Sequence, residues 1–336
     1  METGIDEYIF SPAASFTEKA LRAFAFQYAG NPLYERFAGA LNCRPGTVRT
    51  IGQIPFLPIS FFKSHNIATS SFTPEVVFES SGTTGSVNSR HLVRDAGLYE
   101  KSFVAAFEAA YGPITDYCIL GLLPSYLERG SSSLVYMVKR MIEISGHPQN
   151  GFYLYDHRQL AQTLQRLEGA GQKALLIGVT YALLDFAEAF PMPLHHTIVM
   201  ETGGMKGRKK ELLRDEVHAL LQGAFGLAHI HSEYGMTELL SQAYSKGHGR
   251  FYPPSWMRVL VREEDDPLAV AAATDRPLTG ALNIIDLANL YSCSFIATED
   301  VGRLYPDGSF EVLGRMDASD VRGCSLMVAD TIDNRQ

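Results

Sequence analysis

The sequence predicts an α/β protein in which parallel strands alternate with helices. From Leu160 to His231, apolar runs of strand length alternate with segments of helical periodicity. Two predicted strands run directly into polar, glycine-bearing segments, at residues 201–207 and 232–238. From about residue 250 the segments become shorter and β-like, and turns such as Pro306-Asp307-Gly308 separate them. These observations predict a parallel sheet with flanking helices and a smaller β subdomain.

The elements follow from periodicity and from helix and turn signals. A helix over 12–28 begins after Ser11-Pro12, and the proline-spaced segment 45–74 is predicted as a short helix and an extended stretch. Val76-Val77-Phe78 is predicted to end a strand at the carboxyl edge of the parallel sheet. Further helices are predicted over 95–110, 131–142, 160–167, 183–190 and 209–221, and further strands over 117–123, 174–179, 197–200, 227–231, 257–261, 280–286, 293–297 and 309–313.

Length and composition bound the class of protein. The chain has 336 residues, of which 46% are hydrophobic, so it is long enough to bury a substantial core. Its net charge of −8 argues against nucleic acid or acidic membranes as partners. The acidic start and the lack of an apolar run long enough to cross a membrane indicate a cytoplasmic protein without a transmembrane segment. The predicted organisation is a helical segment at 1–50, an α/β nucleotide-binding core at 51–250, a small β subdomain at 251–313 and a short arm at 314–336.

The segment Phe78-Glu79-Ser80-Ser81-Gly82-Thr83-Thr84-Gly85-Ser86 is the strongest candidate for a ligand-binding loop. Its hydroxyls and backbone N–H groups can converge on phosphate oxygens, and its glycines let the backbone approach a ligand. The segment lacks the Walker A spacing and its lysine, and an ordinary surface turn is the alternative interpretation.

Four motifs together resemble a known superfamily. Ser80-Ser81-Gly82-Thr83-Thr84-Gly85, Tyr234-Gly235-Met236-Thr237-Glu238, Thr298-Glu299-Asp300-Val301-Gly302 and Gly314-Arg315-Met316-Asp317 occur in the order and approximate spacing of the core motifs of adenylate-forming enzymes. That superfamily includes acyl-CoA synthetases, phenylacetate-CoA ligases and luciferases. Residues 54–59, 123–129 and 322–325 further resemble the acyl-protein synthetases of bacterial luminescence, which activate fatty acids. The resemblance begins at about residue 50.

The resemblance implies ATP and Mg²⁺ as cofactors and assigns a role to each motif. Ser80, Ser81, Gly82, Thr83, Thr84 and Gly85 would bind phosphate, Thr237 would contact the α-phosphate, and Glu238 would ligate Mg²⁺. Asp300 would accept hydrogen bonds from the ribose with Arg315 nearby, and Gly203, Gly204, Tyr234 and Gly235 would lie at the nucleotide. The substrate would be a fatty acid or another carboxylate, and Cys324 would carry the acyl group as a thioester to a partner protein such as a reductase or transferase.

The sequence departs from the superfamily pattern in two places. The phosphate loop commonly continues to Pro-Lys, whereas here Ser86-Val87-Asn88-Ser89-Arg90 follows, so Arg90 is the candidate for the positive charge. Larger members carry a C-terminal domain with a catalytic lysine, and the sequence after Gly314 offers no counterpart, so the fold is expected to be the N-terminal core alone.

Three alternative functions remain open from the residues. A carboxylate ligase would release the acyl group to CoA or to a small acceptor. His91-Leu92-Val93-Arg94-Asp95 fits the His-x-x-x-Asp pattern of acyltransferases that need no ATP, and a non-catalytic chain would only bind nucleotide or a partner. For Cys324 the alternative is a small buried side chain, and Cys293 is the next candidate acceptor.

Overall fold

The computed structural model describes residues 4–80, 87–123, 131–204, 212–263, 266 and 268–316, and the chain divides into two compact units. The first unit includes the chain up to Ser102, the short segment Thr237–Ser241 and the chain from Tyr252 onward. The second unit includes Phe103–Met236 and Gln242–Phe251. The polypeptide therefore passes from the second unit to the first between Met236 and Thr237, inside the Tyr234 to Glu238 motif.

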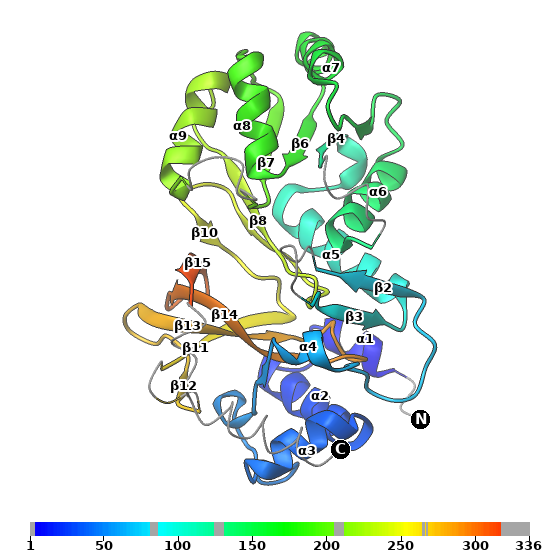
Figure 1. Ribbon diagram of the computed structural model, residues 1–336, viewed down its shortest axis with the longest axis vertical. Helices are drawn as coiled ribbons and strands as arrows, with labels where there is room; N and C mark the ends of the chain where they lie inside the picture. The colour runs from blue at the N-terminus through cyan, green and yellow to red at the C-terminus, as the bar shows by residue number, and fades with distance from the viewer. Residues whose placement is uncertain are drawn as a thin grey trace. The chain divides into compact units, whose positions relative to one another are not determined.

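The second unit is a mainly parallel α/β layer structure, as the sequence predicts (Figure 1). Its sheet has the order β5-β4-β6-β7-β8-β9, in which only the β8–β9 pair is antiparallel. The strands are β4 (Cys118–Leu122), β5 (Gly151–Phe152), β6 (Ala174–Gly178), β7 (Thr197–Glu201), β8 (His231–Tyr234) and β9 (Ala243–Ser245), and β10 (Arg250–Phe251) lies against β8 and β9.

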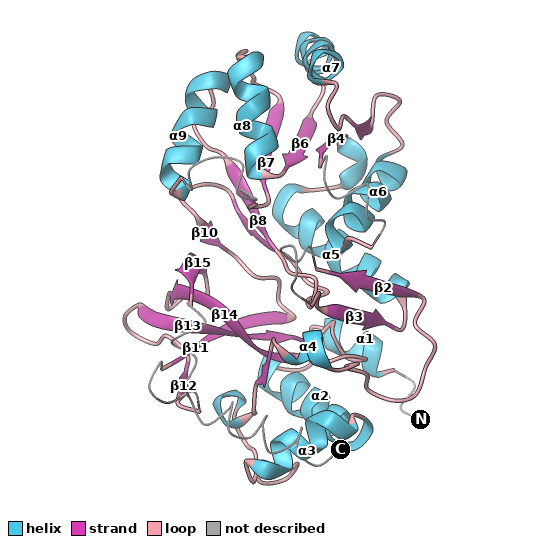
Figure 2. Ribbon diagram, viewed as in Figure 1, coloured by secondary structure: helices cyan, strands magenta, loops and turns pink. Residues whose placement is uncertain are grey.

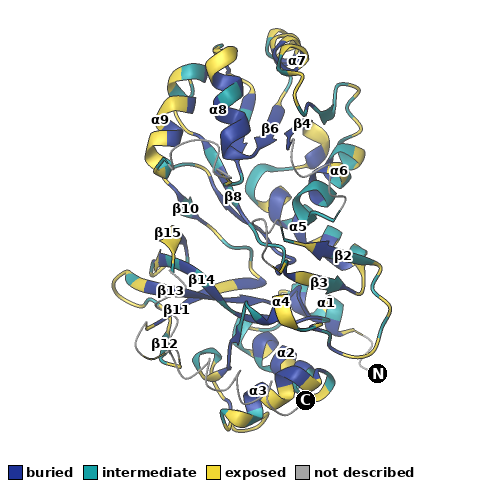
Figure 3. Ribbon diagram, in the orientation of Figure 1, coloured by how far each residue is buried: buried dark blue, intermediate teal, exposed yellow. Residues whose placement is uncertain are grey.

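Helices connect these strands and cover the sheet. They are the end of α5 (Ala96–Tyr111), η2 (Ile114–Asp116), α6 (Ser133–Ser145), α7 (His157–Ala170), α8 (Thr180–Ala189) and α9 (Arg214–Phe225). α6 packs against β4, and α8 packs against α9. Every residue of β4 and β6 is buried, as expected for central strands of a parallel sheet covered on both faces (Figure 3).

The first unit contains an antiparallel sheet of order β15-β14-β13-β11-β12, with β1 (Leu57–Pro58) parallel to β14 (Figure 2). The strands are β11 (Met257–Arg262), β12 (Val270–Ala271), β13 (Leu278–Asp286), β14 (Phe295–Leu304) and β15 (Phe310–Arg315). The helices of this unit are α1 (Ile5–Phe10), α2 (Phe16–Gly30), α3 (Pro32–Ala40), η1 (Ile51–Gln53) and α4 (Phe61–Ser64). Phe24, Tyr34 and Phe295 pack together and join α2, α3 and the start of β14.

A separate two-stranded antiparallel sheet, β2 (Val76–Glu79) with β3 (Arg90–Val93), corrects one prediction. The strand ending at Phe78 was expected in the parallel sheet, but it pairs with β3 instead, with Phe78 opposite His91. The Ser80–Ser86 segment therefore connects two hairpin strands rather than following a strand of the parallel sheet. The strand pattern was read correctly, but the partner of a strand depends on contacts that periodicity does not contain.

Three predicted boundaries were also wrong. The first long helix begins at Phe16 rather than near Pro12, because Ser15 and Glu18 form a capping box there. The strand predicted at 227–231 lies at His231–Tyr234, after the Gly226 C-cap, so Ser232, Glu233 and Tyr234 belong to a strand and not to a loop. β14 extends to Leu304 and includes the Thr298–Gly302 motif that was expected to follow the strand.

Among the residues that the structure describes, helices long and apolar enough to span a bilayer do not occur.

Candidate functional site

Two hydrogen bonds between Ser80 and Ser89 join the chain on either side of the predicted phosphate loop. The Ser80 N–H donates to the Ser89 carbonyl at 3.0 Å, and the Ser89 N–H donates to the Ser80 hydroxyl at 2.9 Å. The central residues of the loop, Ser81, Gly82, Thr83, Thr84 and Gly85, lie outside the described residues. Their assignment to phosphate remains a prediction.

Arg90, the candidate replacement for the loop lysine, is exposed at the start of β3. Its Nε lies 3.8 Å from Oε1 of Glu79, its cross-strand neighbour, and its Nη1 lies 3.5 Å from Asn66 Oδ1. An exposed pair of this kind contributes little to stability. Among the described residues, the contacts of the Arg90 guanidinium are thus an exposed ion pair and a long hydrogen bond.

The Thr237–Ser241 segment is fixed by three buried side chains of the first unit. The ring of His91 lies with Nδ1 2.8 Å from the Thr237 carbonyl oxygen, and Asn289 Nδ2 donates to the Glu238 carbonyl at 2.7 Å. Asp286 accepts from the N–H groups of Leu240 and Ser241 at 2.8 and 2.9 Å and from the Ser241 hydroxyl at 2.5 Å. The segment is irregular, so these side chains take the place that a strand ladder would otherwise have.

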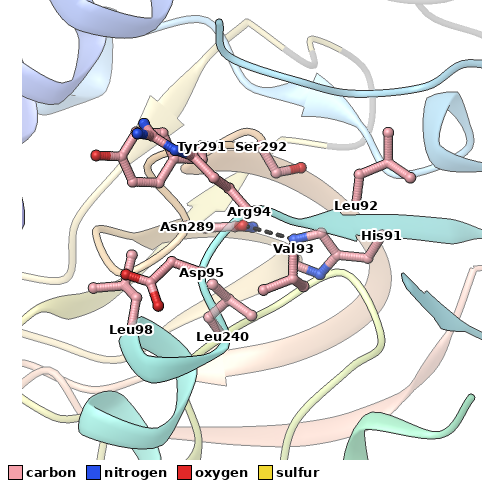
Figure 4. Close-up of a pocket in the computed structure, with 10 residues that line it drawn as sticks. All are labelled: His91, Leu92, Val93, Arg94, Asp95, Leu98, Leu240, Asn289, Tyr291 and Ser292. Carbon is pink, nitrogen blue, oxygen red and sulfur yellow. Dashed lines mark hydrogen bonds between the residues drawn. The ribbon is translucent and has the colours of Figure 1, made fainter. Parts of the chain in front are cut away.

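His91 and Asn289 meet in the wall of a small pocket beside this segment (Figure 4). His91 Nε2 lies 2.9 Å from Asn289 Oδ1, and both side chains are fully buried. Burial lowers the pKa of His91 to about 4, so its ring is neutral at pH 7. In the His-x-x-x-Asp motif, the Asp95 carboxylate instead caps the Gly97 N–H at 2.8 Å. A buried histidine with both nitrogens occupied does not suit a general base for an acyltransferase, and we discard that alternative.

Glu238 is a buried carboxyl whose surroundings suit a cation. Only 6% of the residue is exposed, and burial raises its pKa, while a hydrogen bond from Ser89, its own backbone N–H and the charges of Arg315 and Lys63 act in the opposite direction. A buried carboxyl loses hydration, and a bound divalent cation would offset the charge of its ionised form. The group therefore fits the predicted Mg²⁺ ligand. Within the described part of the chain, no group of three His, Cys, Asp or Glu side chains is placed to hold a metal ion.

Asp300 and Arg315 face each other across β14 and β15. Arg315 Nε lies 3.3 Å from Asp300 Oδ1, and the two residues are register partners. Asp300 is 6% exposed, whereas 76% of the Arg315 side chain is exposed. The carboxylate is thus fixed in a strand, while the guanidinium can move.

In the second unit, Gly203 and Gly204 form a turn that only glycine adopts easily. Their φ angles are 75° and 90°, and no atom lies within 4 Å of a Cβ added to Gly203. The Gly203 N–H donates to Glu201 Oε2 at 2.7 Å. The N–H groups of Thr180 and Tyr181, at the start of α8, donate to the carbonyls of Gly203 and Gly204 at 3.1 and 3.4 Å. The predicted adenine-lining turn is therefore held on both sides.

Glu201, which sequence reasoning did not single out, is the centre of this arrangement. It is 4% exposed and accepts from the Thr180 hydroxyl at 3.2 Å. Burial alone would raise its pKa, but hydrogen bonds from His218, Ser232 and the Gly203 N–H, together with the charge of Arg214 at 3.5 Å, lower it to about 2. The carboxylate stays ionised and fixes the turn.

Tyr234 and Gly235 complete the predicted residues of the second unit. Tyr234 is 8% exposed, and its ring packs 5.8 Å from that of Phe251. A Cβ at Gly235 would contact Glu233 Oε1, so a side chain there would require the Glu233 side chain to move. The structure divides the predicted site residues between the units, with Thr237, Glu238, Asp300, Arg315, Ser80 and Arg90 in the first and Gly203, Gly204, Tyr234 and Gly235 in the second.

Two cysteines are buried, and the predicted acyl acceptor lies outside the described residues. Cys293 is fully buried, and burial raises the pKa of its thiol to about 12, so it is unsuited to be an acyl acceptor and the fallback assigned to it was wrong. Cys118 is likewise buried, with its pKa raised to about 12. Cys324, the predicted acceptor, lies outside the described residues.

The sequence did not identify Asn289, Asp286 and Glu201 as site-forming, and it marked His91 only in the His-x-x-x-Asp pattern of an acyltransferase. Two of them carried a readable signal, because Asp286 ends a strand after Ile284-Ile285 and Glu201 ends a strand after Ile198-Val199-Met200. A carboxylate in that position must be buried and therefore needs donors. Asn289 and His91 carried no comparable signal.

Comparisons with known proteins give a fold but no close relative. No protein-family model and no curated protein matches the chain. Among solved structures, ATP-bound MatB from Rhodopseudomonas palustris matches with a TM-score of 0.52 and 16% identity, covering 73% of this chain and 49% of MatB. A 2-hydroxyisobutyryl-CoA ligase in the postadenylation state, in complex with R3-HIB-AMP, matches with a TM-score of 0.56 and 11% identity, covering 91% of this chain and 72% of that protein.

These identities establish likeness of fold, and the chain spans about half the length of MatB. The parallel sheet with flanking helices and the antiparallel sheet agree with the predicted fold class. The chain therefore has the α/β fold of adenylate-forming enzymes.

Proposed function

We propose that the chain activates a carboxylic acid with ATP, forming an acyl-adenylate and pyrophosphate. The observation that carries this proposal is Glu238, a buried carboxyl held on an irregular segment by His91 and Asn289. Its place in a Tyr-Gly-x-Thr-Glu motif, within the fold of adenylate-forming enzymes, supports the same reaction. Activation requires the carboxylate and the α-phosphate to be aligned and the phosphate charge to be offset.

The remaining roles follow the motifs. Thr237 contacts the α-phosphate, Glu238 holds Mg²⁺ and Asp300 accepts from the ribose hydroxyls. Gly203 and Gly204 would lie against the adenine ring, as the resemblance implies. Bound Mg²⁺ supplies positive charge that offsets the charge developing on the phosphates. Ser80, Thr83, Thr84 and Arg90 complete the phosphate contacts.

The finer proposal is that the chain is an acyl-protein synthetase for a fatty acid. The Cys324 thiolate attacks the carbonyl carbon of the acyl-adenylate, the C–S bond forms, and the C–O bond to phosphate breaks as AMP leaves; the thiol proton passes to solvent. The thioester is then passed to a partner reductase or transferase. Transfer to CoA or a small acceptor is the alternative outcome of the same adenylate.

Exchange of labelled pyrophosphate into ATP tests the first step. We expect exchange that depends on the added acid, with tetradecanoate more active than acetate or an aromatic acid. Glu238→Gln should reduce exchange by about 100-fold, because Mg²⁺ contributes several kcal/mol of charge stabilisation. Glu35→Gln, at an exposed carboxylate of α3, is the matched control and should leave exchange unchanged.

A second measurement tests the acyl acceptor. Incubation with ATP and labelled fatty acid should give protein-bound label that neutral hydroxylamine removes and that Cys324→Ser abolishes while exchange continues. Exchange without protein labelling would favour the CoA-type ligase. Absence of exchange with every acid, together with no rise in melting temperature on adding Mg·ATP, would reject the whole proposal.

A further inference from the structure

We propose that Arg262, the last residue of β11, is a positioning residue that holds Asp300 where its carboxylate can accept from the ribose hydroxyls. This inference rests on the proposed role of Asp300 at the ribose. Arg262 lies in none of the four motifs, and it acts on Asp300 through the backbone of β14.

Asp300 lies in an irregular part of β14. The register of the β13–β14 pair shifts between Ala281 and Asn283. Residues 298–300 of β14 therefore lie opposite Leu282 alone, and the ladder is interrupted by a β-bulge that contains Asp300. A bulge changes the alternation of side chains along its strand. The direction of the Asp300 side chain consequently depends on what fixes this bulge.

The guanidinium of Arg262 takes the place of ladder hydrogen bonds at the bulge. β11 is the neighbour of β13 in the sheet, and the Arg262 side chain reaches past β13 to β14 (Figure 1). Its Nη1 donates to the Leu282 carbonyl at 3.1 Å and to Asn283 Oδ1 at 2.6 Å, and its Nη2 donates to the Thr298 carbonyl. One planar, rigid group thus joins both strands of the bulge.

Thr298 extends this support to the backbone of Asp300. The Thr298 hydroxyl donates to the Leu282 carbonyl at 2.8 Å and accepts from the Asp300 N–H at 3.1 Å. The Leu282 carbonyl accepts from both Arg262 and Thr298, which its two lone pairs allow. A continuous chain of hydrogen bonds therefore runs from the guanidinium to the Asp300 N–H.

The guanidinium is buried and charged. Arg262 is 9% exposed, and burial lowers its pKa to about 10 while the charge of Glu299 acts in the opposite direction, so it stays protonated at pH 7. A protonated guanidinium only donates, so the Asn283 amide must turn its oxygen towards it. The amide nitrogen of this fully buried asparagine has no partner among the described residues. The contact with Arg262 is therefore the one that orients this amide at the bulge.

The nucleotide preference of pyrophosphate exchange tests the inference. 2′,3′-Dideoxy-ATP lacks the ribose hydroxyls that Asp300 would bind, so we expect the parent to prefer ATP by about 10-fold or more in kcat/KM. Arg262→Lys keeps the charge but loses the planar fork, and it should reduce this preference to about threefold or less. Arg258→Lys, at an exposed arginine of the same strand, is the matched control and should keep the preference of the parent.

A purely structural Arg262 would give a different result. Arg262→Lys would then lower the melting temperature and slow exchange equally with both nucleotides, and the unchanged preference would overturn the proposal. If Arg262→Lys does not fold, Thr298→Val decides, because it removes the acceptor of the Asp300 N–H and leaves the guanidinium in place. A reduced preference in this variant supports the proposal, and a preference equal to that of the parent overturns it.

Amide hydrogen exchange of the full chain without nucleotide examines the bulge itself. In Arg262→Lys, peptides that cover β14 should exchange about tenfold faster than in the parent, while peptides that cover β4 should be unchanged. Unchanged protection of β14 would overturn the inference even if pyrophosphate exchange is robust. If the parent shows no pyrophosphate exchange with any acid but β14 loses protection in the variant, the proposed function fails while the role of Arg262 at the bulge stands.

Discussion

The Thr237–Ser241 segment of the first unit and the Gly203–Gly204 turn of the second are both irregular, and both are predicted to contact nucleotide, but they are held by different chemistry. His91, Asn289 and Asp286 hold the first through neutral donors and a carboxylate whose donors are backbone N–H groups and a hydroxyl. Glu201 holds the second with a cation, Arg214, nearby.

This difference in chemistry affects the pKa values of the two buried carboxyls, Asp286 and Glu201. Burial raises the pKa of Asp286 to about 6 although four donors point at it, whereas Arg214 and the donors around Glu201 lower its pKa to about 2. Neutral donors therefore do not fully offset the loss of hydration, and a charged partner helps to do so. The Gly203–Gly204 turn of the second unit therefore depends on the ionised carboxylate of Glu201. The Thr237–Ser241 segment of the first unit depends less on the ionisation of Asp286.

The largest effect on this comparison should come from removing Glu201. Glu201→Ala leaves Arg214 and His218 without their carboxylate and frees the Gly203 N–H, so we expect the free energy of unfolding to fall by about 3 kcal/mol. Urea unfolding measures this loss. Glu35→Gln serves again as the exposed control. If Glu201→Ala lowers the free energy of unfolding no more than this control does, Glu201 does not hold the turn.

The next largest effect should be the pH dependence of the free energy of unfolding, which has opposite signs for the two carboxyls. The lowered pKa of Glu201 means that its contribution is present above the unfolded value of 4.5 and is lost as pH falls towards 2. The contribution of Asp286 has the reverse sign, because this carboxyl binds its proton more tightly in the folded protein than in the unfolded chain. The free energy of unfolding of the parent should therefore fall by about 2 kcal/mol as pH rises from 3.8 to 6.

Urea midpoints of the parent, Glu201→Gln and Asp286→Asn across pH 3 to 7 measure these slopes. The difference between parent and Glu201→Gln should shrink on acidification below pH 4.5. The difference between parent and Asp286→Asn should grow as pH falls from 6 towards 4. Parallel curves for the two variants would contradict the assignment of a charged and a neutral environment.

A smaller effect is expected at Gly203. Gly203→Ala places a Cβ in open space but in the left-handed region, so the cost should be the backbone term of about 1 kcal/mol. Thermal unfolding measures it, with the melting temperature in Mg·ATP as a second reading. An unchanged stability would mean that the turn adjusts its backbone.

The smallest effect on stability should come from Arg315, whose guanidinium is largely exposed. Arg315→Met removes the pair with Asp300 and should change the free energy of unfolding by less than about 0.5 kcal/mol. If Asp300 binds the ribose with Arg315 nearby at the nucleotide, as proposed, the same variant raises the ATP concentration needed for pyrophosphate exchange several-fold. A stable variant with unchanged ATP dependence would remove Arg315 from the site.

Local sequence patterns predicted many elements of this fold. Strands β4, β6 and β7 and helices α5, α7 and α8 lie close to their predicted positions, because periodicity and caps act over a few residues. The glycines at 203, 204 and 235 were assigned to the nucleotide from the resemblance, and the positive φ of the first two was seen only in the structure. The roles of Thr237, Glu238 and Asp300 were predicted from motifs and await the measurements above.

What the sequence determined by itself was the α/β class and the polar segments that interrupt it, since both depend on neighbouring residues. Only the tertiary structure decided what holds those segments. His91 meets Thr237 from 146 positions away and Asn289 from 198, and β2 pairs with β3 rather than joining the parallel sheet. Contacts at such separations leave no periodic signal, because each is set by how whole elements pack and by which buried polar atoms then need partners.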